Sequence, residues 1–162
     1  MLQLSNASKD DLKIISDLAK IIWNDYYLPI IGQEQVNYML ENIYNYDSLL
    51  NLMEKQKHVF YLIEYELNVI GFLSISSNEE RHFFLQKFYI KSDFSRNGIG
   101  SRVLKILENK LNPKTIHLTV NRNNFQSINF YFKNGFKIKS LQDFDIGNGF
   151  KMLDFIMKKD FI

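Results

Sequence analysis

The apolar positions in the first third of the chain follow helical spacing. Apolar residues recur every three or four positions over 9–26, which predicts a helix that Pro29 and Gly32 end. The same spacing over 33–44 predicts a second helix. A third should follow Asp47, whose carboxylate is expected to cap it.

The rest of the chain is dominated by strand-forming runs. Runs rich in β-branched and aromatic residues, with a short one at the start, predict strands over 2–4, 58–65, 69–75, 82–90, 116–120, 136–142 and 150–158. Helical spacing returns over 99–111, and again from Asn123 or Asn124 to Asn134, where Gly135 is placed to end the helix in the left-handed conformation.

This order of elements predicts one α/β domain over residues 1–162. Strand 82–90, the helix after it and strand 116–120 form a crossover, which requires the two strands to be parallel and the connection right-handed. Short links join the other strands into antiparallel hairpins. We therefore expect a mixed, mostly antiparallel sheet of about six to seven strands with flanking helices.

The stretch Ser95-Arg96-Asn97-Gly98-Ile99-Gly100-Ser101 lies between strand 82–90 and the helix after it. Two glycines let backbone N–H groups approach an anion, and the N-terminus of a helix favours negative charge. Arg96 adds a positive charge. The stretch, called the glycine loop below, is predicted to hold the pyrophosphate of a cofactor.

Two common nucleotide motifs do not fit the glycine loop. The dinucleotide fingerprint requires a third glycine where Val103 stands, and an acid about twenty residues later, where Val120 and Asn121 stand. The nucleotide P-loop requires Lys and Ser or Thr after its last glycine, but Ser101-Arg102 follows Gly100.

Two motifs resemble those of the GCN5-related N-acetyltransferase (GNAT) family, and the likeness covers roughly residues 58–158. The first is the strand ending Phe88-Tyr89-Ile90 with the glycine loop after it. The second is Val120-Asn121-x-x-Asn124-x-x-Ser127-x-x-Phe130-Tyr131-x-x-x-Gly135-Phe136. Ser95 replaces the family's usual Gln or Arg, and Ser127 its usual alanine.

The resemblance implies the GNAT fold and acetyl-CoA as cosubstrate. It implies that the backbone of Phe88, Tyr89 and Ile90 pairs with the pantetheine arm, and that an N–H near Phe88 polarises the acetyl carbonyl. The phosphates are then held by Arg96, Asn97, Gly98, Ile99, Gly100 and Ser101. Asn124 is expected to contact the pantetheine.

The reaction implied is transfer of the acetyl group to a primary amine by direct attack in a ternary complex. Tyr131 is the predicted general acid, because a phenol with a pKa of about 10 stays protonated at neutral pH and can donate to a departing thiolate. No general base is identified. His58, His82 and His117 are scattered and expected to be structural; two carboxylates, Glu64 and Glu66, remain candidates.

Trp23, Tyr26 and Tyr27 form an aromatic patch in the N-terminal third. Two interpretations are open: the patch packs against the sheet as ordinary core, or it forms one wall of the site that binds the acceptor. Aromatic faces suit an alkylammonium group. A small amine or polyamine is the favoured acceptor. The alternatives are a protein N-terminus or lysine, and a non-catalytic module that senses acetyl-CoA.

Composition excludes several other classes. A net charge of +2 with 18 acids argues against a nucleic-acid partner, and the lack of cysteine excludes disulfides and thiolate metal sites. There is no paired His at ligand spacing, so no metal is expected. No apolar run approaches about 18 residues and the N-terminal segment is polar, so we expect a cytoplasmic protein without a membrane partner. The oligomeric state, homodimer included, is left open.

Overall fold

A twisted seven-stranded sheet organises the computed structural model, which describes residues 1–95 and 97–162. Its strands are β1 Leu2–Asn6, β2 Val59–Tyr65, β3 Asn68–Glu79, β4 His82–Ile90, β5 Thr115–Asn121, β6 Lys137–Gly147 and β7 Phe150–Asp160. The spatial order is β1-β2-β3-β4-β5-β7-β6, and every pair is antiparallel except β4–β5. The predicted mixed, mostly antiparallel α/β fold is confirmed.

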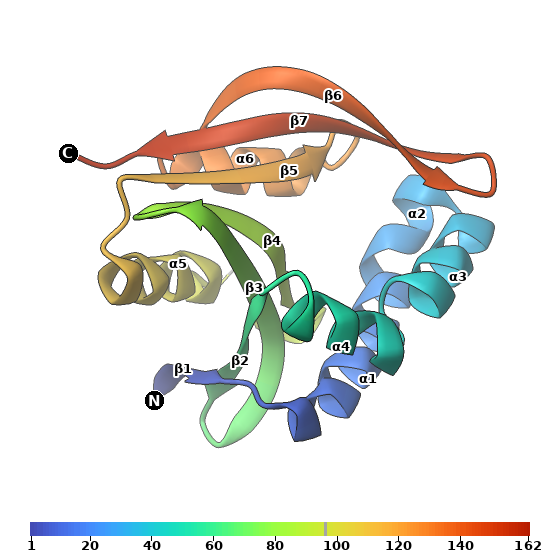
Figure 1. Cartoon of the computed structure of the whole chain (residues 1–162), viewed down its shortest axis with the longest axis horizontal. Helices are drawn as coiled ribbons and strands as arrows, with labels where there is room; N and C mark the ends of the chain where they lie inside the picture. The colour runs from blue at the N-terminus through green and yellow to red at the C-terminus, as the bar shows by residue number, and fades with distance from the viewer. Residues whose placement is uncertain (96) are drawn as a thin grey trace.

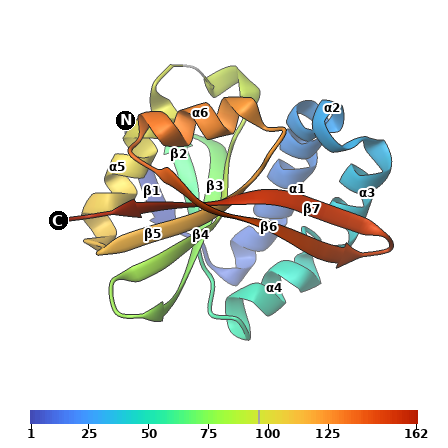
Figure 2. The same cartoon turned by 90° about the horizontal axis from the view of Figure 1, so that it is seen from above.

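Helices cover both faces of the sheet (Figures 1 and 2). They are α1 Leu12–Ile22, α2 Leu28–Ile31, α3 Gln33–Asn42, α4 Tyr46–Glu54, α5 Ile99–Leu111 and α6 Phe125–Lys133. One hydrophobic core joins the sheet to α5 and α6, and a second joins it to α1, α3 and α4. The β6–β7 hairpin extends past the sheet to α3, where the Tyr38 hydroxyl donates to the Ile146 carbonyl at 2.5 Å.

The two halves of the sheet separate between β4 and β5. These strands pair over only four positions, from His82 opposite Thr115 to Leu85 opposite Leu118. Beyond Leu85, within residues 1–95 and 97–162, β4 remains paired with β3 alone and β5 with β7 alone. A register shift between β3 and β4 leaves Gln86 without an opposing residue, and such bulges bend a strand. The sheet therefore has a closed end and an open end at this junction.

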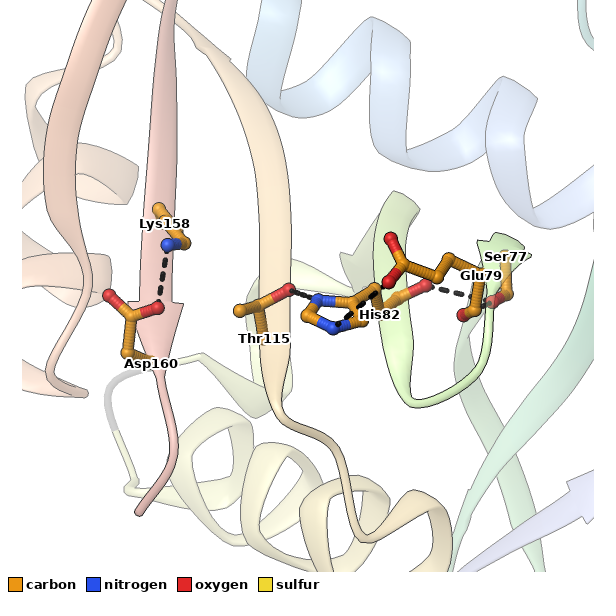
Figure 3. A network of polar contacts seen from close by, with 6 residues as sticks. All are labelled: Ser77, Glu79, His82, Thr115, Lys158 and Asp160. Carbon is orange, nitrogen blue, oxygen red and sulfur yellow. Dashed lines mark hydrogen bonds and ion pairs between the residues drawn. The ribbon is translucent and has the colours of Figure 1, made fainter.

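Polar side chains fasten the closed end (Figure 3). The His82 Nδ1 and Thr115 Oγ1 atoms lie 2.8 Å apart and join the first residues of β4 and β5. The Ser77 hydroxyl lies 2.8 Å from the His82 carbonyl and 2.7 Å from the Glu79 carbonyl, which ties the β3–β4 turn to the same point. The divergence of the strands is thus confined to the opposite end.

The predicted break at Pro29 is wrong. After α1, the chain continues as a π-helical segment, η2 Trp23–Tyr27, and then as α2 across Pro29. Proline is tolerated in the first turn of a helix, because its missing N–H has no intrahelical acceptor there. Gly32, with φ of 82°, ends the run as predicted.

The prediction that Asp47 caps the third helix is also wrong. The cap of α4 is Asn45, whose side-chain oxygen accepts the Ser48 N–H at 2.9 Å, and Asp47 lies in the first turn. Asparagine and aspartate both cap helices, so residue type alone does not separate Asn45 from Asp47. Asn124 caps α6, in agreement with one of the two predicted positions, and Gly135 has φ of 88°.

Replacing Asn45 with alanine is expected to lower the free energy of unfolding by about 1 kcal/mol, because the Ser48 N–H loses its acceptor. Asp47→Asn is the control, since it removes only a charge near the positive end of α4 and should cost about 0.5 kcal/mol or less. Urea denaturation of both variants measures the difference. An equal or larger loss for Asp47→Asn would contradict the assignment of the cap.

Candidate active site

A cavity of about 280 Å³ lies at the open end of the sheet. Its walls come from the end of α1 and η2, the last residues of β4, the glycine loop, the start of α5, and α6. Nine of the predicted site residues line it: Tyr26, Tyr27, Phe88, Tyr89, Ile90, Gly98, Gly100, Ser101 and Tyr131. Trp23, Asn97, Ile99 and Asn124 lie outside the lining, and Arg96 lies outside the described residues.

The N-terminus of α5 contributes backbone donors to this cavity. Gly98 is the N-cap residue and has φ of 72°, a left-handed conformation that side-chain-bearing residues rarely adopt. The first amides of any helix have no intrahelical acceptor, and they carry the positive end of the helix dipole. With Gly98, Gly100 and Ser101 on the cavity wall, this end of α5 has the chemistry of an anion site.

Gly100 lies where α5 approaches Phe130 of α6 closely. A Cβ atom at this position would lie 3.0 Å from Cε2 and 3.2 Å from Cζ of Phe130. The Phe130 ring in turn faces the Phe88 ring, with 6.0 Å between their centroids. Any side chain at Gly100 must therefore displace an aromatic ring that lines the cavity.

The last residues of β4 present a strand edge at the open end. Phe88, Tyr89 and Ile90 pair with Leu73, Phe72 and Gly71 of β3 on one edge. In the described part of the chain, no β5 residue pairs with them on the other edge. A strand edge of this kind offers backbone N–H and C=O groups to an extended partner.

Tyr131 reaches the cavity from α6. Only 8% of its surface is exposed, and its ring packs edge-on against Phe130 and Phe136, with centroids 5.2 and 5.5 Å away. Burial raises the pKa of the Tyr131 phenol well above its ordinary value, and the Tyr26 phenol adds to this shift. Tyr131 therefore keeps its proton throughout the physiological range.

Tyr27 and Tyr89 line the cavity from the other half of the molecule. The Tyr89 hydroxyl lies 2.8 Å from the Tyr44 hydroxyl, and burial raises the pKa of both cavity tyrosines. Trp23 is 1% exposed and stacks on Tyr27 with ring centroids 4.3 Å apart. The predicted aromatic wall is thus formed by Tyr26 and Tyr27, while Trp23 supports Tyr27 from behind.

Tyr26 and Asn124 form a direct link across the open end. The Tyr26 hydroxyl donates to the Asn124 side-chain oxygen at 2.7 Å, and the same oxygen accepts the Ser127 N–H at 3.1 Å. Asn124 is only 2% exposed. The contact joins η2 to the N-terminus of α6 over a separation of 98 residues, and no sequence pattern indicated it.

The general-base candidates raised by the sequence lie away from the cavity lining. His82 belongs to the closed end, and Glu64 accepts hydrogen bonds from Gln3 and Ser5 at the β1–β2 edge. Asp25 of η2 lines the cavity. One other carboxylate was missed, Asp154, which is buried on β7. The signal for Asp154 is its charge within the apolar run Leu153 to Met157.

Residues 1–95 and 97–162 contain neither a metal-binding cluster nor a membrane-spanning helix. No group of three or more histidine or carboxylate side chains there is placed to hold a metal ion. Within the same residues, no helix combines the length and apolar character needed to cross a bilayer.

Comparison with known proteins places this architecture in a family. The chain is 27% identical to the spermidine N(1)-acetyltransferase of Thermoplasma acidophilum, over 99% of this chain and 98% of that protein. Its fold matches the PaiA N-acetyltransferase of the same organism, solved in complex with coenzyme A, with a TM-score of 0.80, 25% identity and 99% of each chain covered.

A GCN5-related N-acetyltransferase from Rhodopseudomonas palustris matches with a TM-score of 0.78 at 14% identity, over 98% of this chain and 95% of that one. At this identity the likeness supports the fold alone. The family model described as the acetyltransferase (GNAT) family matches residues 15–136, which is most of the chain. The chain therefore belongs to the GNAT acetyltransferase family.

Proposed function

We propose that this protein transfers the acetyl group of acetyl-CoA to a primary amine, with small amines and polyamines as the favoured acceptors. The observation that carries the proposal is the unpaired edge of β4 at Phe88 to Ile90, which leads along one cavity to the N-terminus of α5. A strand edge suits the amides of pantetheine, and a helix N-terminus suits a pyrophosphate.

The free edge of β4 and the N-terminus of α5 define the half of the site that we assign to the cofactor. The backbone of Phe88, Tyr89 and Ile90 pairs with the pantetheine arm, and an N–H near Phe88 polarises the acetyl carbonyl. Arg96 and the residues from Asn97 to Ser101 hold the phosphates. The coenzyme A complex of the PaiA relative supports this assignment, because the two chains share their fold over nearly their whole length.

The reaction joins the amine nitrogen to the acetyl carbon and breaks the carbon–sulfur bond. The amine must be neutral when it attacks, so it gives up one proton beforehand and a second as the amide forms. Tyr131 supplies a proton to the departing sulfur, and its buried, protonated phenol lines the same cavity as β4.

The acceptor side is assigned to the face formed by η2. Tyr26 and Tyr27 present aromatic surface to the cavity, and Asp25 adds a carboxylate to its lining. Both features favour a cationic alkylamine. The similarity to a spermidine N(1)-acetyltransferase over 99% of the chain supports a polyamine in particular.

Release of free thiol from acetyl-CoA tests the proposed function. The panel contains spermidine, spermine, simple alkylamines, and peptides with a free N-terminus or a lysine. We expect turnover with alkylamines or polyamines, and product masses increased by one acetyl group. Turnover of the peptides alone would indicate that the acceptor is a protein N-terminus or lysine. Binding of acetyl-CoA without thiol release from any amine would indicate a sensor and contradict the proposal.

Tyr131→Phe is expected to lower kcat by about tenfold or more, because the departing thiolate loses its proton donor, while the affinity for acetyl-CoA changes little. Tyr61→Phe provides a matched control, since Tyr61 is another buried tyrosine of the same core but lies outside the cavity lining. Steady-state kinetics and acetyl-CoA titration of both variants are the measurements. Unchanged turnover in Tyr131→Phe would show that Tyr131 is not the general acid.

Gly100→Val should weaken acetyl-CoA binding more than Arg96→Ala does. The valine side chain must displace Phe130 and disturb the amides of the first turn of α5. Loss of the arginine leaves these backbone amides in place to bind the phosphates. Calorimetric titration with acetyl-CoA, with circular dichroism to verify folding, gives the two affinities. The reverse ranking would show that Arg96, not the backbone, dominates phosphate binding.

A further inference from the structure

The hydrogen bond between Tyr26 and Asn124 has a fixed direction. Asn124 is the N-cap residue of α6, and its side-chain oxygen accepts the Ser127 N–H at 3.1 Å. This backbone donor fixes the orientation of the Asn124 carboxamide, because only the oxygen of that group can accept. The Tyr26 hydroxyl lies 2.7 Å from the same oxygen, so it must donate its proton there.

This direction decides what the Tyr26 hydroxyl can offer to a ligand. A phenol has one O–H donor, and its oxygen can also accept hydrogen bonds. With the proton directed at Asn124, the Tyr26 oxygen can act toward a ligand only as an acceptor. Its partner in a ligand must therefore be an N–H or O–H group.

The Tyr26 side chain crosses from one wall of the cavity to the other. Its backbone belongs to η2, and its hydroxyl ends against the N-terminus of α6. Gln126 and Ser127 in the first turn of α6 line the cavity, as Tyr26 itself does. Asn124 is 2% exposed and lies outside the lining. A ligand in the cavity therefore meets the Tyr26 side chain at this end of α6.

Tyr131 points toward the same end of α6. It follows Asn124 by about two helical turns, so both residues lie on the same side of the helix. Side chains of a helix lean toward its N-terminus, which is where the Tyr26 hydroxyl lies. Burial raises the pKa of Tyr131, and the nearby Tyr26 phenol adds to the shift. The Tyr26 oxygen is therefore close to the proposed proton donor of the reaction.

The neighbours of Tyr26 in η2 favour a cationic partner for its oxygen. Asp25 precedes it and lines the cavity with a carboxylate. Tyr27 follows it, lines the cavity too, and packs edge-on against its ring with centroids 5.1 Å apart. A carboxylate and aromatic faces attract an ammonium group. An amine suits this position better than the amides of pantetheine, which are assigned to the edge of β4.

We propose that the Tyr26 oxygen accepts a hydrogen bond from the nitrogen of the acceptor amine and holds that nitrogen beside the thioester. This inference rests on the proposed function and names the contact that positions the attacking atom. A primary amine that has become neutral still carries N–H groups. One of them can stay bonded to Tyr26 while the lone pair points at the acetyl carbon. Tyr26 takes no proton from the amine in this role.

Two ligands separate this hydrogen bond from the aromatic surface of Tyr26. Spermidine can donate from a terminal nitrogen. A spermidine analogue with trimethylammonium groups at both ends keeps the charge but has no terminal N–H, and it serves as a competitive inhibitor. Tyr26→Phe keeps the ring and removes the oxygen. Its kcat/KM for spermidine should fall about tenfold or more, while the inhibition constant of the analogue changes by less than about twofold.

Tyr38→Phe is the matched control. The Tyr38 hydroxyl also joins distant segments, because it donates to the Ile146 carbonyl, but Tyr38 lies outside the cavity lining. Both variants lose one such hydrogen bond, so their melting temperatures should fall by similar small amounts. The kcat/KM of Tyr38→Phe for spermidine should stay within about twofold of the wild type. Calorimetric titration should give an unchanged affinity for acetyl-CoA in both variants.

Three results would overturn the role of Tyr26 and leave the acetyltransferase proposal intact. A kcat/KM of Tyr26→Phe within about twofold of the wild type shows that the oxygen does not bind the amine. An equal loss of affinity for spermidine and for the methylated analogue assigns Tyr26 to the shape of the wall. A loss confined to the affinity for acetyl-CoA assigns the contact to pantetheine. A wild type that acetylates no amine overturns the proposed function as well.

Discussion

The site depends on a constraint of backbone hydrogen bonding at β4. This strand is paired on both edges through Leu85, but among the described residues only β3 pairs with it from Lys87 to Ile90. Backbone N–H and C=O groups in a protein interior require partners, so the second edge must face solvent or an extended ligand. The His82–Thr115 contact holds the strands together at the closed end and confines the gap to the end where the glycine loop lies.

The open end is also where the two hydrophobic cores approach each other. The core with α5 and α6 contributes Tyr131, and the core with α1, α3 and α4 contributes Tyr27 and Tyr89. The hydrogen bond from Tyr26 to Asn124 connects the two halves directly at this end. The proposed acetyl transfer requires a cosubstrate and an acceptor to meet, and residues of both cores line the cavity at this end.

Much of the fold was predictable from local sequence. The parallel β4–β5 pair, the α5 helix after the glycine loop and the Gly135 terminator follow from periodicity and turn chemistry, and the structure contains all three. The glycine loop and the motif from Asn124 to Tyr131 also contribute part of the cavity lining, because these residues are close in sequence to the elements that position them.

What the sequence could not provide depends on contacts between distant segments. The cap of α4 is Asn45 and not the expected Asp47, because the backbone geometry decides which residue lies at the N-cap. The partnership of Tyr26 with Asn124 joins segments 98 residues apart. The side of the sheet to which Asp154 points is fixed only by the register of β7, because a shift of one residue would have turned it to the other side.

Hydrogen–deuterium exchange with and without acetyl-CoA tests the central claim, that the free edge of β4 and the N-terminus of α5 receive the cosubstrate. The account predicts slower exchange on binding for amides within 86–90 and 97–101, with little change at the closed end around His82 and Thr115. Binding of acetyl-CoA that leaves exchange in both segments unchanged, or protects the closed end instead, would contradict it.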